Sequence, residues 1–246
     1  MKQFILRIKR KIQSFSHKTL EGDPFIRRLR SLVIGEGMLH EGNPYLINHA
    51  IAHMPKNGIV LEIGSYGGLS TNLMLYLMRK HQRANLLFTC DPWIYGGYIN
   101  GYHSNDPFID GRTDVSRDAY GKYLKQAFIQ GIQFLNGQHL PHSFQYTSDD
   151  FFEMYRNNTS ETDVFGNKAP LGKAISFAYI DGNHDWEFVE RDFENVHRLL
   201  LSGGFILFDD SIDGTDFGSA RFMQVMMQHP AYKLVAKNPN YLFIKQ

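Results

Sequence analysis

The feature that most constrains this chain is an apolar run at residues 59–63 that leads directly into a glycine-rich turn. The sequence of residues 59–71 is Ile-Val-Leu-Glu-Ile-Gly-Ser-Tyr-Gly-Gly-Leu-Ser-Thr. Such a run is typical of a strand buried on both faces of a parallel sheet. Ser70 and Thr71 then begin a helical pattern that extends to Arg79. This arrangement of a strand, a glycine turn and a helix start is typical of a ligand-binding motif. Small residues let a ligand approach the backbone, and the helix start offers free N–H groups.

The order of residues in this turn distinguishes between ligands. A dinucleotide fingerprint has the pattern G-x-G-x-x-G and leads to a pyrophosphate. Here Glu62 comes two residues before Gly64, and an acid at that place disfavours a phosphate and suits a cationic amino group. The alternative is an ordinary strand-to-helix turn without a ligand. We expect cofactor contacts from Glu62, Gly64, Ser65, Tyr66, Gly68 and Ser70.

Length and composition indicate a globular chain. With 246 residues, of which 43% are hydrophobic, one α/β domain with an N-terminal extension is expected. The single cysteine, Cys90, excludes an internal disulfide and a cysteine-based zinc cluster. No run approaches the ~20 apolar residues of a membrane span, and basic residues at 7–11 interrupt any signal-peptide core. We therefore expect a cytoplasmic protein.

Charge is distributed unevenly along the chain. Residues 1–31 carry nine Lys and Arg against two acids, whereas the rest of the chain has a net charge of −6. The main domain is therefore not expected to bind nucleic acid. Residues 2–16 have the pattern of a basic amphipathic helix, which would contact an anionic membrane surface, contact a partner subunit in a homo-oligomer, or pack on its own domain. We divide the chain into an extension, 1–43, and a domain, 44–246.

The remaining patterns predict further strands and helices in alternation. Expected strands cover 59–63, 85–90, 142–147, 174–180 and 205–208, with expected helices at 44–53, 116–135, from Ser148 onward, and at 187–201. Residues 232–245 predict a β-hairpin around Asn238-Pro239-Asn240. Residues 21–42 are rich in turn signals, with no element expected. Residues 93–137 begin with an aromatic, glycine-hinged stretch that predicts a lid or acceptor platform, or else an insertion that packs on itself.

Several motifs together resemble a known enzyme family. The pattern Glu-x-Gly-x-x-Gly-Gly at 62–68 resembles the first motif of class I methyltransferases that use S-adenosylmethionine (SAM), E-x-G-x-G-x-G, and departs from it at Tyr66. Ile-Asp-Gly-x-His at 180–184 and Gly-Gly-x-Ile-x-Phe-Asp-Asp at 203–210 are similar to the macrocin O-methyltransferase-like group, which methylates sugar hydroxyls. The resemblance implies an α/β, Rossmann-like seven-stranded, mostly parallel sheet with helices on both faces and a C-terminal antiparallel hairpin.

The resemblance also implies roles for residues outside the glycine turn. Asp91 ends the second strand, where an acid accepts ribose hydroxyls in nucleoside-binding folds; capping the next turn is its other reading. Asp149, with Ser148 as the alternative, corresponds to the position that meets the adenine amino group; helix capping competes for both. Residues 38–45 correspond to the cofactor entrance.

Acidic residues follow the fourth and fifth strands. In the implied topology these strands are neighbours, so Asp181 is expected near Asp209 and Asp210. Crowded carboxylates repel unless a cation compensates, and oxygen ligands suit Mg²⁺, Mn²⁺ or Ca²⁺ better than zinc. All three match metal-binding positions of metal-assisted O-methyltransferases, with Mg²⁺ the first choice. Structural capping without a metal is the alternative, and His184 has three readings: general base, metal neighbour or helix cap.

The expected activity is the transfer of a methyl group from SAM to a hydroxyl of a small molecule, with a sugar or glycosylated natural product as the acceptor. A divalent cation bound by the three acids would lower the hydroxyl pKa, and His184, with Asp181 beside it, would accept the proton. Three alternatives stay open: a metal-independent SAM methyltransferase, a cephalosporin-hydroxylase-like enzyme, and a non-catalytic SAM-binding module.

Overall fold

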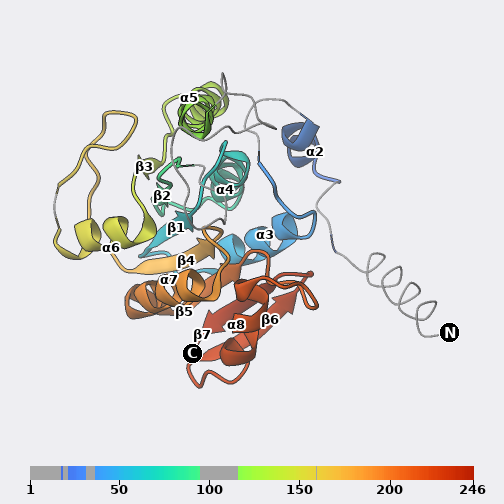
Figure 1. The fold of residues 1–246 in the computed structure, drawn as a ribbon. Coiled ribbons are helices and arrows are strands. Elements are labelled where there is room, and N and C mark those ends of the chain that lie inside the picture. The colour runs from blue at the N-terminus through green and yellow to red at the C-terminus, as the bar shows by residue number, and fades with distance from the viewer. Residues whose placement is uncertain (1–17, 19–21, 32–36, 95–115, 159) are drawn as a thin grey trace.

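The computed structural model describes residues 18, 22–31, 37–94, 116–158 and 160–246. Its centre is a seven-stranded sheet with the strand order β3-β2-β1-β4-β5-β7-β6 (Figure 1). Strands β1 to β5 are parallel, and β7 is antiparallel to both β5 and β6. The predicted fold class is confirmed. The strands are β1 (Ile59–Ile63), β2 (Leu87–Cys90), β3 (His142–Phe144), β4 (Ile175–Ile180), β5 (Leu200–Phe208), β6 (Tyr232–Lys237) and β7 (Tyr241–Lys245).

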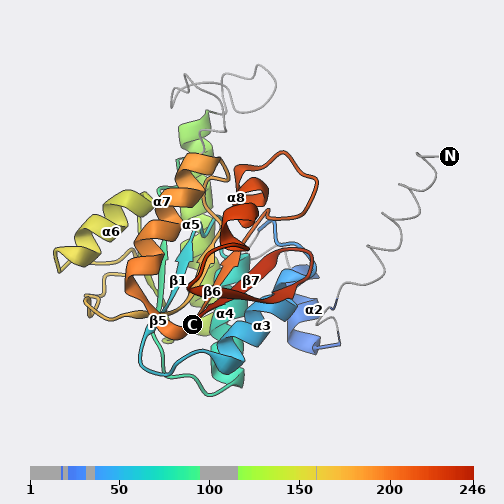
Figure 2. The ribbon, with the colours of Figure 1, turned by 90° about the horizontal axis from the view of Figure 1, so that it is seen from below.

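Helices cover both faces of the sheet (Figures 1 and 2). One apolar cluster joins the sheet to α6, α7 and α8 through Phe151, Phe193 and Phe222. The other joins it to α3, α4 and α5, with Leu46 and Phe128 among its members. Burial on both faces explains why the central strands lack polar alternation. The helices are α2 (Pro24–Ser31), α3 (Asn43–His53), α4 (Leu69–Lys80), α5 (Arg117–Asn136), α6 (Ser148–Arg156), α7 (Trp186–Leu199) and α8 (Gly218–Met226).

Three local expectations differ from the structure. Residues 21–42, expected to form only turns, contain α2, because the Asp23 carboxylate accepts the N–H of Phe25 and the Phe25 ring stacks on Tyr76 at 4.1 Å. Helix α8 was not predicted. The helix expected through 201 ends at Leu199, and β5 begins at Leu200, which pairs with Ile175. The predicted helix at 2–16 and residues 95–115 of the aromatic insertion lie outside the described residues.

No helix in the described ranges has both the length and the apolar character that crossing a bilayer requires.

Two glycines allow the close backbone approaches on which the site depends. Gly64, at the end of β1, has φ +87°, and a Cβ there would lie 2.0 Å from the Asp181 carbonyl oxygen at the end of β4. A Cβ on Gly42, just before α3, would lie 1.7 Å from the Asn238 carbonyl oxygen in the β6–β7 turn. Only glycine fits either position. These two close approaches bring three segments together at one edge of the sheet: the end of β1, the end of β4 and the start of α3.

Candidate active site

Asp91 holds the glycine turn in place from the end of β2. Its Oδ2 accepts the backbone N–H groups of Ser65 and Tyr66, each at 2.8 Å, and its Oδ1 accepts that of Trp93 at 2.6 Å. Burial raises the pKa of the Asp91 carboxyl despite these three donors, which favour its charged form. An ionised carboxylate offers about four acceptor positions. Among the described residues, these three donors leave Asp91 one acceptor position for a further donor, such as a ribose hydroxyl.

Glu62 forms hydrogen bonds with two residues in the first turn of α4. Its carboxylate is fully buried and accepts the hydroxyls of Ser70 and Thr71, the latter at 2.5 Å. Burial raises the pKa of Glu62 to about 7, against the lowering effect of the two hydroxyls. Both carboxylate oxygens of Glu62 face α4, and the Ser70 hydroxyl donates to one of them. The cofactor contacts of Glu62 and Ser70 stay predictions.

The turn itself has one feature that suits a ligand. Ser65 is buried, and its Oγ has no hydrogen-bond partner within the described part of the chain. Tyr66 adopts φ +44°, a left-handed conformation, which explains why a glycine is common at this place in the resembling family. Gly68 has φ +92° and directly precedes α4 as its N-cap residue. A buried hydroxyl without a partner indicates that this turn has acceptor or donor capacity to offer.

Of the two candidates for the adenine contact, Ser148 points inward and Asp149 outward. Asp149 is exposed, and its Oδ2 lies 3.3 Å from Nη2 of Arg191. The Ser148 hydroxyl instead pairs with the buried Asp192 of α7, whose pKa burial raises to about 7. The structure thus turns Ser148, but not Asp149, toward the interior, against Asp192 of α7.

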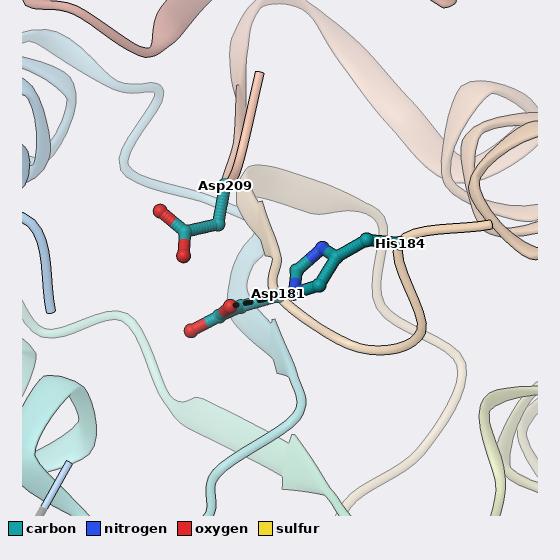
Figure 3. Close-up of side chains that lie close together, drawn as sticks. All are labelled: Asp181, His184 and Asp209. Atoms are coloured by element: carbon teal, nitrogen blue, oxygen red, sulfur yellow. Dashed lines mark ion pairs between the residues drawn. The ribbon is translucent and has the colours of Figure 1, made fainter. Parts of the chain in front are cut away.

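Three side chains from β4, β5 and the loop after β4 meet at the carboxyl edge of the sheet (Figure 3). One ligand atom each of Asp181, His184 and Asp209 lies within 4.8 Å of the others. The Asp181 carboxyl lies close to the Tyr179 hydroxyl and to the Asp209 carboxyl. Burial raises the pKa of Asp181 well above its ordinary value, and the adjacent Asp209 raises it further. A half-buried carboxylate next to a buried one is repelled by it unless a proton or a cation lies between them.

Asp210 also lies close to His184. Its backbone turns left-handed with φ +46°, and its Oδ2 lies 3.4 Å from Nε2 of His184. The same nitrogen lies 3.9 Å from Oδ1 of Asp181. Asp210 is not part of the three-atom cluster, which contains His184 in its place. The expected proximity of Asp181 to Asp209 is therefore seen, whereas Asp210 faces the imidazole.

Sequence reasoning missed several residues that surround this cluster. Asn43 and Asn240 donate to Asp209 from the start of α3 and the β6–β7 turn. Phe217, at the start of α8, places its ring edge-on to His184 at 5.6 Å. The available signals were weak: Asn43 lies in the segment expected at the cofactor entrance, and Asn240 in a segment that otherwise reads only as a turn.

Two surface hollows, of about 310 and 550 Å³, lie elsewhere. One is bounded by α8 and the β6–β7 hairpin and includes Asp213 and Tyr241; the other lies between α6 and α7. None of the glycine-turn or cluster residues lines either of them.

Comparison with known proteins agrees with this geometry. A family model described as a methyltransferase domain matches residues 61–211, more than half of the chain. Sequence comparison with curated proteins gives no match. Among solved structures, the O-methyltransferase TomG of Streptomyces achromogenes, involved in tomaymycin synthesis and solved with SAM, has a TM-score of 0.54 at 11% identity, over 98% of this chain and 96% of TomG.

Two further structures share the fold. The apo structure of CalS11, a TDP-rhamnose 3′-O-methyltransferase of calicheamicin biosynthesis, has a TM-score of 0.52 at 14% identity, over 93% of this chain and 96% of CalS11. The Bacillus cereus O-methyltransferase solved with SAH has a TM-score of 0.50 at 12% identity, over 91% of each chain. At such identities these likenesses establish the fold alone. The matched domain and the seven-stranded sheet confirm the class I resemblance at the level of family and fold: this chain belongs to the methyltransferase-domain family.

Proposed function

We propose that the protein is a SAM-dependent O-methyltransferase that acts on a hydroxyl of a small molecule, with a sugar as the first choice, assisted by a divalent cation. One observation carries the proposal. The ligand atoms of Asp181, His184 and Asp209 gather within 4.8 Å at the carboxyl edge of the sheet, and Asp181 lies against the glycine turn through Gly64. Ligands of parallel α/β sheets bind at this edge.

The glycine turn supports SAM as the cofactor. The spare acceptor position of Asp91 and the unpaired hydroxyl of Ser65 suit the hydroxyls of a ribose. Ser148, at the start of α6, stays the candidate for the adenine contact, with its hydroxyl oriented by Asp192. The TomG and Bacillus cereus structures, which share the fold, hold SAM and SAH respectively.

The donor set supports a hard divalent cation. Asp181 and Asp209 provide carboxylate oxygens, and hydrogen-bonded oxygens of this kind are typical ligands of Mg²⁺ and Mn²⁺. When bound, such a cation lowers the pKa of a hydroxyl that it contacts. Asp181 and Asp209 would hold it, and its positive charge would offset the repulsion between the two carboxylates.

His184 is assigned the role of proton acceptor. Its Nε2 lies near carboxylate oxygens of both Asp181 and Asp210, at 3.9 and 3.4 Å, and these charges would stabilise the imidazolium that forms. The acceptor hydroxyl would lose its proton to Nε2, and its oxygen would form a bond to the SAM methyl carbon as the bond to sulfur breaks. Phe217, whose exposed fraction is 39%, borders His184 and offers an aromatic face for a sugar ring.

Calorimetry tests the cofactor first. The purified chain is titrated with SAM and, separately, with NAD as the control nucleotide. Binding of SAM without binding of NAD supports the proposal. Absence of SAM binding, with the chain shown to be folded by circular dichroism, would reject every methyltransferase reading at once. Transfer of labelled methyl groups to a panel of nucleotide sugars and catechols then identifies the acceptor class.

A further inference from the structure

Asp209 is held by two buried amides that come from opposite ends of the domain. Asn43 is the first residue of α3, and Asn240 directly precedes β7; both side chains are completely buried. The Nδ2 atoms of Asn43 and Asn240 donate to the same oxygen, Oδ1 of Asp209, at 2.5 and 2.7 Å.

The amide network is closed, which fixes the orientation of both side chains. The Asn240 amide also donates to Oδ1 of Asn43 at 2.9 Å, and its own Oδ1 accepts the backbone N–H of Ser211 at 3.0 Å. The second N–H of Asn43 is directed to the Tyr179 hydroxyl at 3.1 Å. Each amide therefore uses two donors and its acceptor. Rotating either amide by 180° would place a carbonyl oxygen against the carboxylate.

The backbone around the two amides is built to bring them together. The Asn238 side chain donates to the Gly42 carbonyl oxygen at 3.1 Å, and Gly42 has no room for a Cβ beside the Asn238 backbone. The start of α3 and the β6–β7 turn are thus fixed to each other next to the end of β5. The pairing of Asn43 with Asn240 follows from this contact.

We infer that Asn43 and Asn240 are positioning residues that occupy Oδ1 of Asp209 and leave Oδ2 as the oxygen that binds the cation. The inference rests on the proposed function. Two N–H donors fill the acceptor positions of Oδ1, so the carboxylate keeps its free capacity on Oδ2. They also restrain the carboxylate from rotating. Partners of this kind behind a metal ligand typically change metal affinity 10- to 100-fold.

Binding of Mn²⁺ alone provides the test, without SAM or acceptor, so that the readout is not activity. Electron paramagnetic resonance of free Mn²⁺ gives the dissociation constant for the full chain. For Asn43→Ala and Asn240→Ala we expect an affinity for Mn²⁺ that is ~10- to 100-fold weaker than that of the wild type. Asn43→Leu and Asn240→Leu, which retain more of the buried volume but no donor, are expected to show the same loss.

Asn136→Ala is the matched control. Asn136 is also a buried amide; it donates to Oδ1 of Asn72 at 2.7 Å and accepts from Arg79 at 2.8 Å, and it has no contact with Asp209. The substitution Asn136→Ala is expected to lower the unfolding temperature and to leave the affinity for Mn²⁺ unchanged.

The outcomes separate the inference from the proposed function. If the wild-type chain does not bind Mn²⁺, the cation itself is rejected. If the wild type binds Mn²⁺ and the folded Asn43 and Asn240 variants bind it within twofold of the wild type, only the positioning role is overturned. The positioning role is equally overturned if none of the four variants folds while Asn136→Ala does, because the amides would then serve stability.

Discussion

Gly64 and Asp181 meet backbone to backbone, and this contact joins the glycine turn to the acidic cluster. The Asp181 N–H donates to the Ile63 carbonyl oxygen at 2.8 Å. The Asp181 carbonyl oxygen lies only 2.0 Å from the position that a Cβ on residue 64 would take. A residue that belongs to the predicted cofactor turn thereby fixes the backbone of a predicted metal ligand.

Gly64→Ala is expected to disturb both sites. The added Cβ clashes with Asp181, and φ +87° is strained for alanine. The free energy of unfolding should fall by ~2 kcal/mol or more, and SAM affinity should fall with it. Gly166→Ala is the control, because Gly166 has φ +86° but no neighbouring atom within 4 Å, so it isolates the cost of the backbone conformation. Equal losses in the two variants, measured by urea unfolding, would contradict the importance of the contact with Asp181.

The raised pKa of Asp192 predicts a free energy of unfolding that depends on pH, separately from catalysis. Burial raises its pKa from 3.8 to about 7 in the folded chain. A folded state that holds the proton more tightly is favoured at low pH, so this contribution is complete below pH ~4 and is lost as pH rises to about 7. Asp192→Asn should therefore gain stability over the wild type across this window, by up to roughly 4 kcal/mol at pH 8. A stability difference that does not change between pH 5 and pH 8 would contradict the shifted pKa.

His184→Gln tests whether the imidazole accepts the proton or binds the cation. If His184 is the proton acceptor, the variant should lose ~100-fold or more in kcat and retain the Mn²⁺ affinity of the wild type. A large loss of Mn²⁺ affinity would instead make His184 the third ligand, as its place in the cluster also allows. Asp118→Asn, which breaks an exposed ion pair with Lys122 on α5, should change neither quantity.

Phe217→Ala tests the acceptor side. Because the ring borders His184 and is partly exposed, its removal should raise KM for the acceptor several-fold while SAM affinity stays unchanged. Initial rates at varied acceptor and fixed SAM measure this. An unchanged KM would exclude Phe217 from the acceptor site.

The features that could be predicted from sequence are those set locally. The apolar runs and glycines predict the parallel strands, and an acid directly after a strand must lie at the sheet's carboxyl edge. The strand order that the family resemblance implied then placed Asp181 near Asp209. The directions in which the side chains point could not be predicted in this way. Ser148 and Asp149 are neighbours on one helix, yet one points inward and the other outward. Asp210 faces His184 because its backbone turns left-handed.

The amides around Asp209 could not be predicted for a different reason. Asn43 and Asn240 are 197 residues apart and meet only because α3 docks against the β6–β7 turn. No local pattern encodes such a contact. Helix α2 likewise depends on docking, since Phe25 stacks on Tyr76 of α4.

The most direct test of the account is methyl transfer from labelled SAM by the wild type and by Asp209→Asn, each with excess chelator and with Mg²⁺ restored. The account predicts activity in the wild type with Mg²⁺, loss in chelator, recovery on adding Mg²⁺, and, with Mg²⁺ present, at least ~100-fold lower activity of Asp209→Asn than of the wild type. Full activity of the wild type in excess chelator, or wild-type activity of Asp209→Asn, would contradict it.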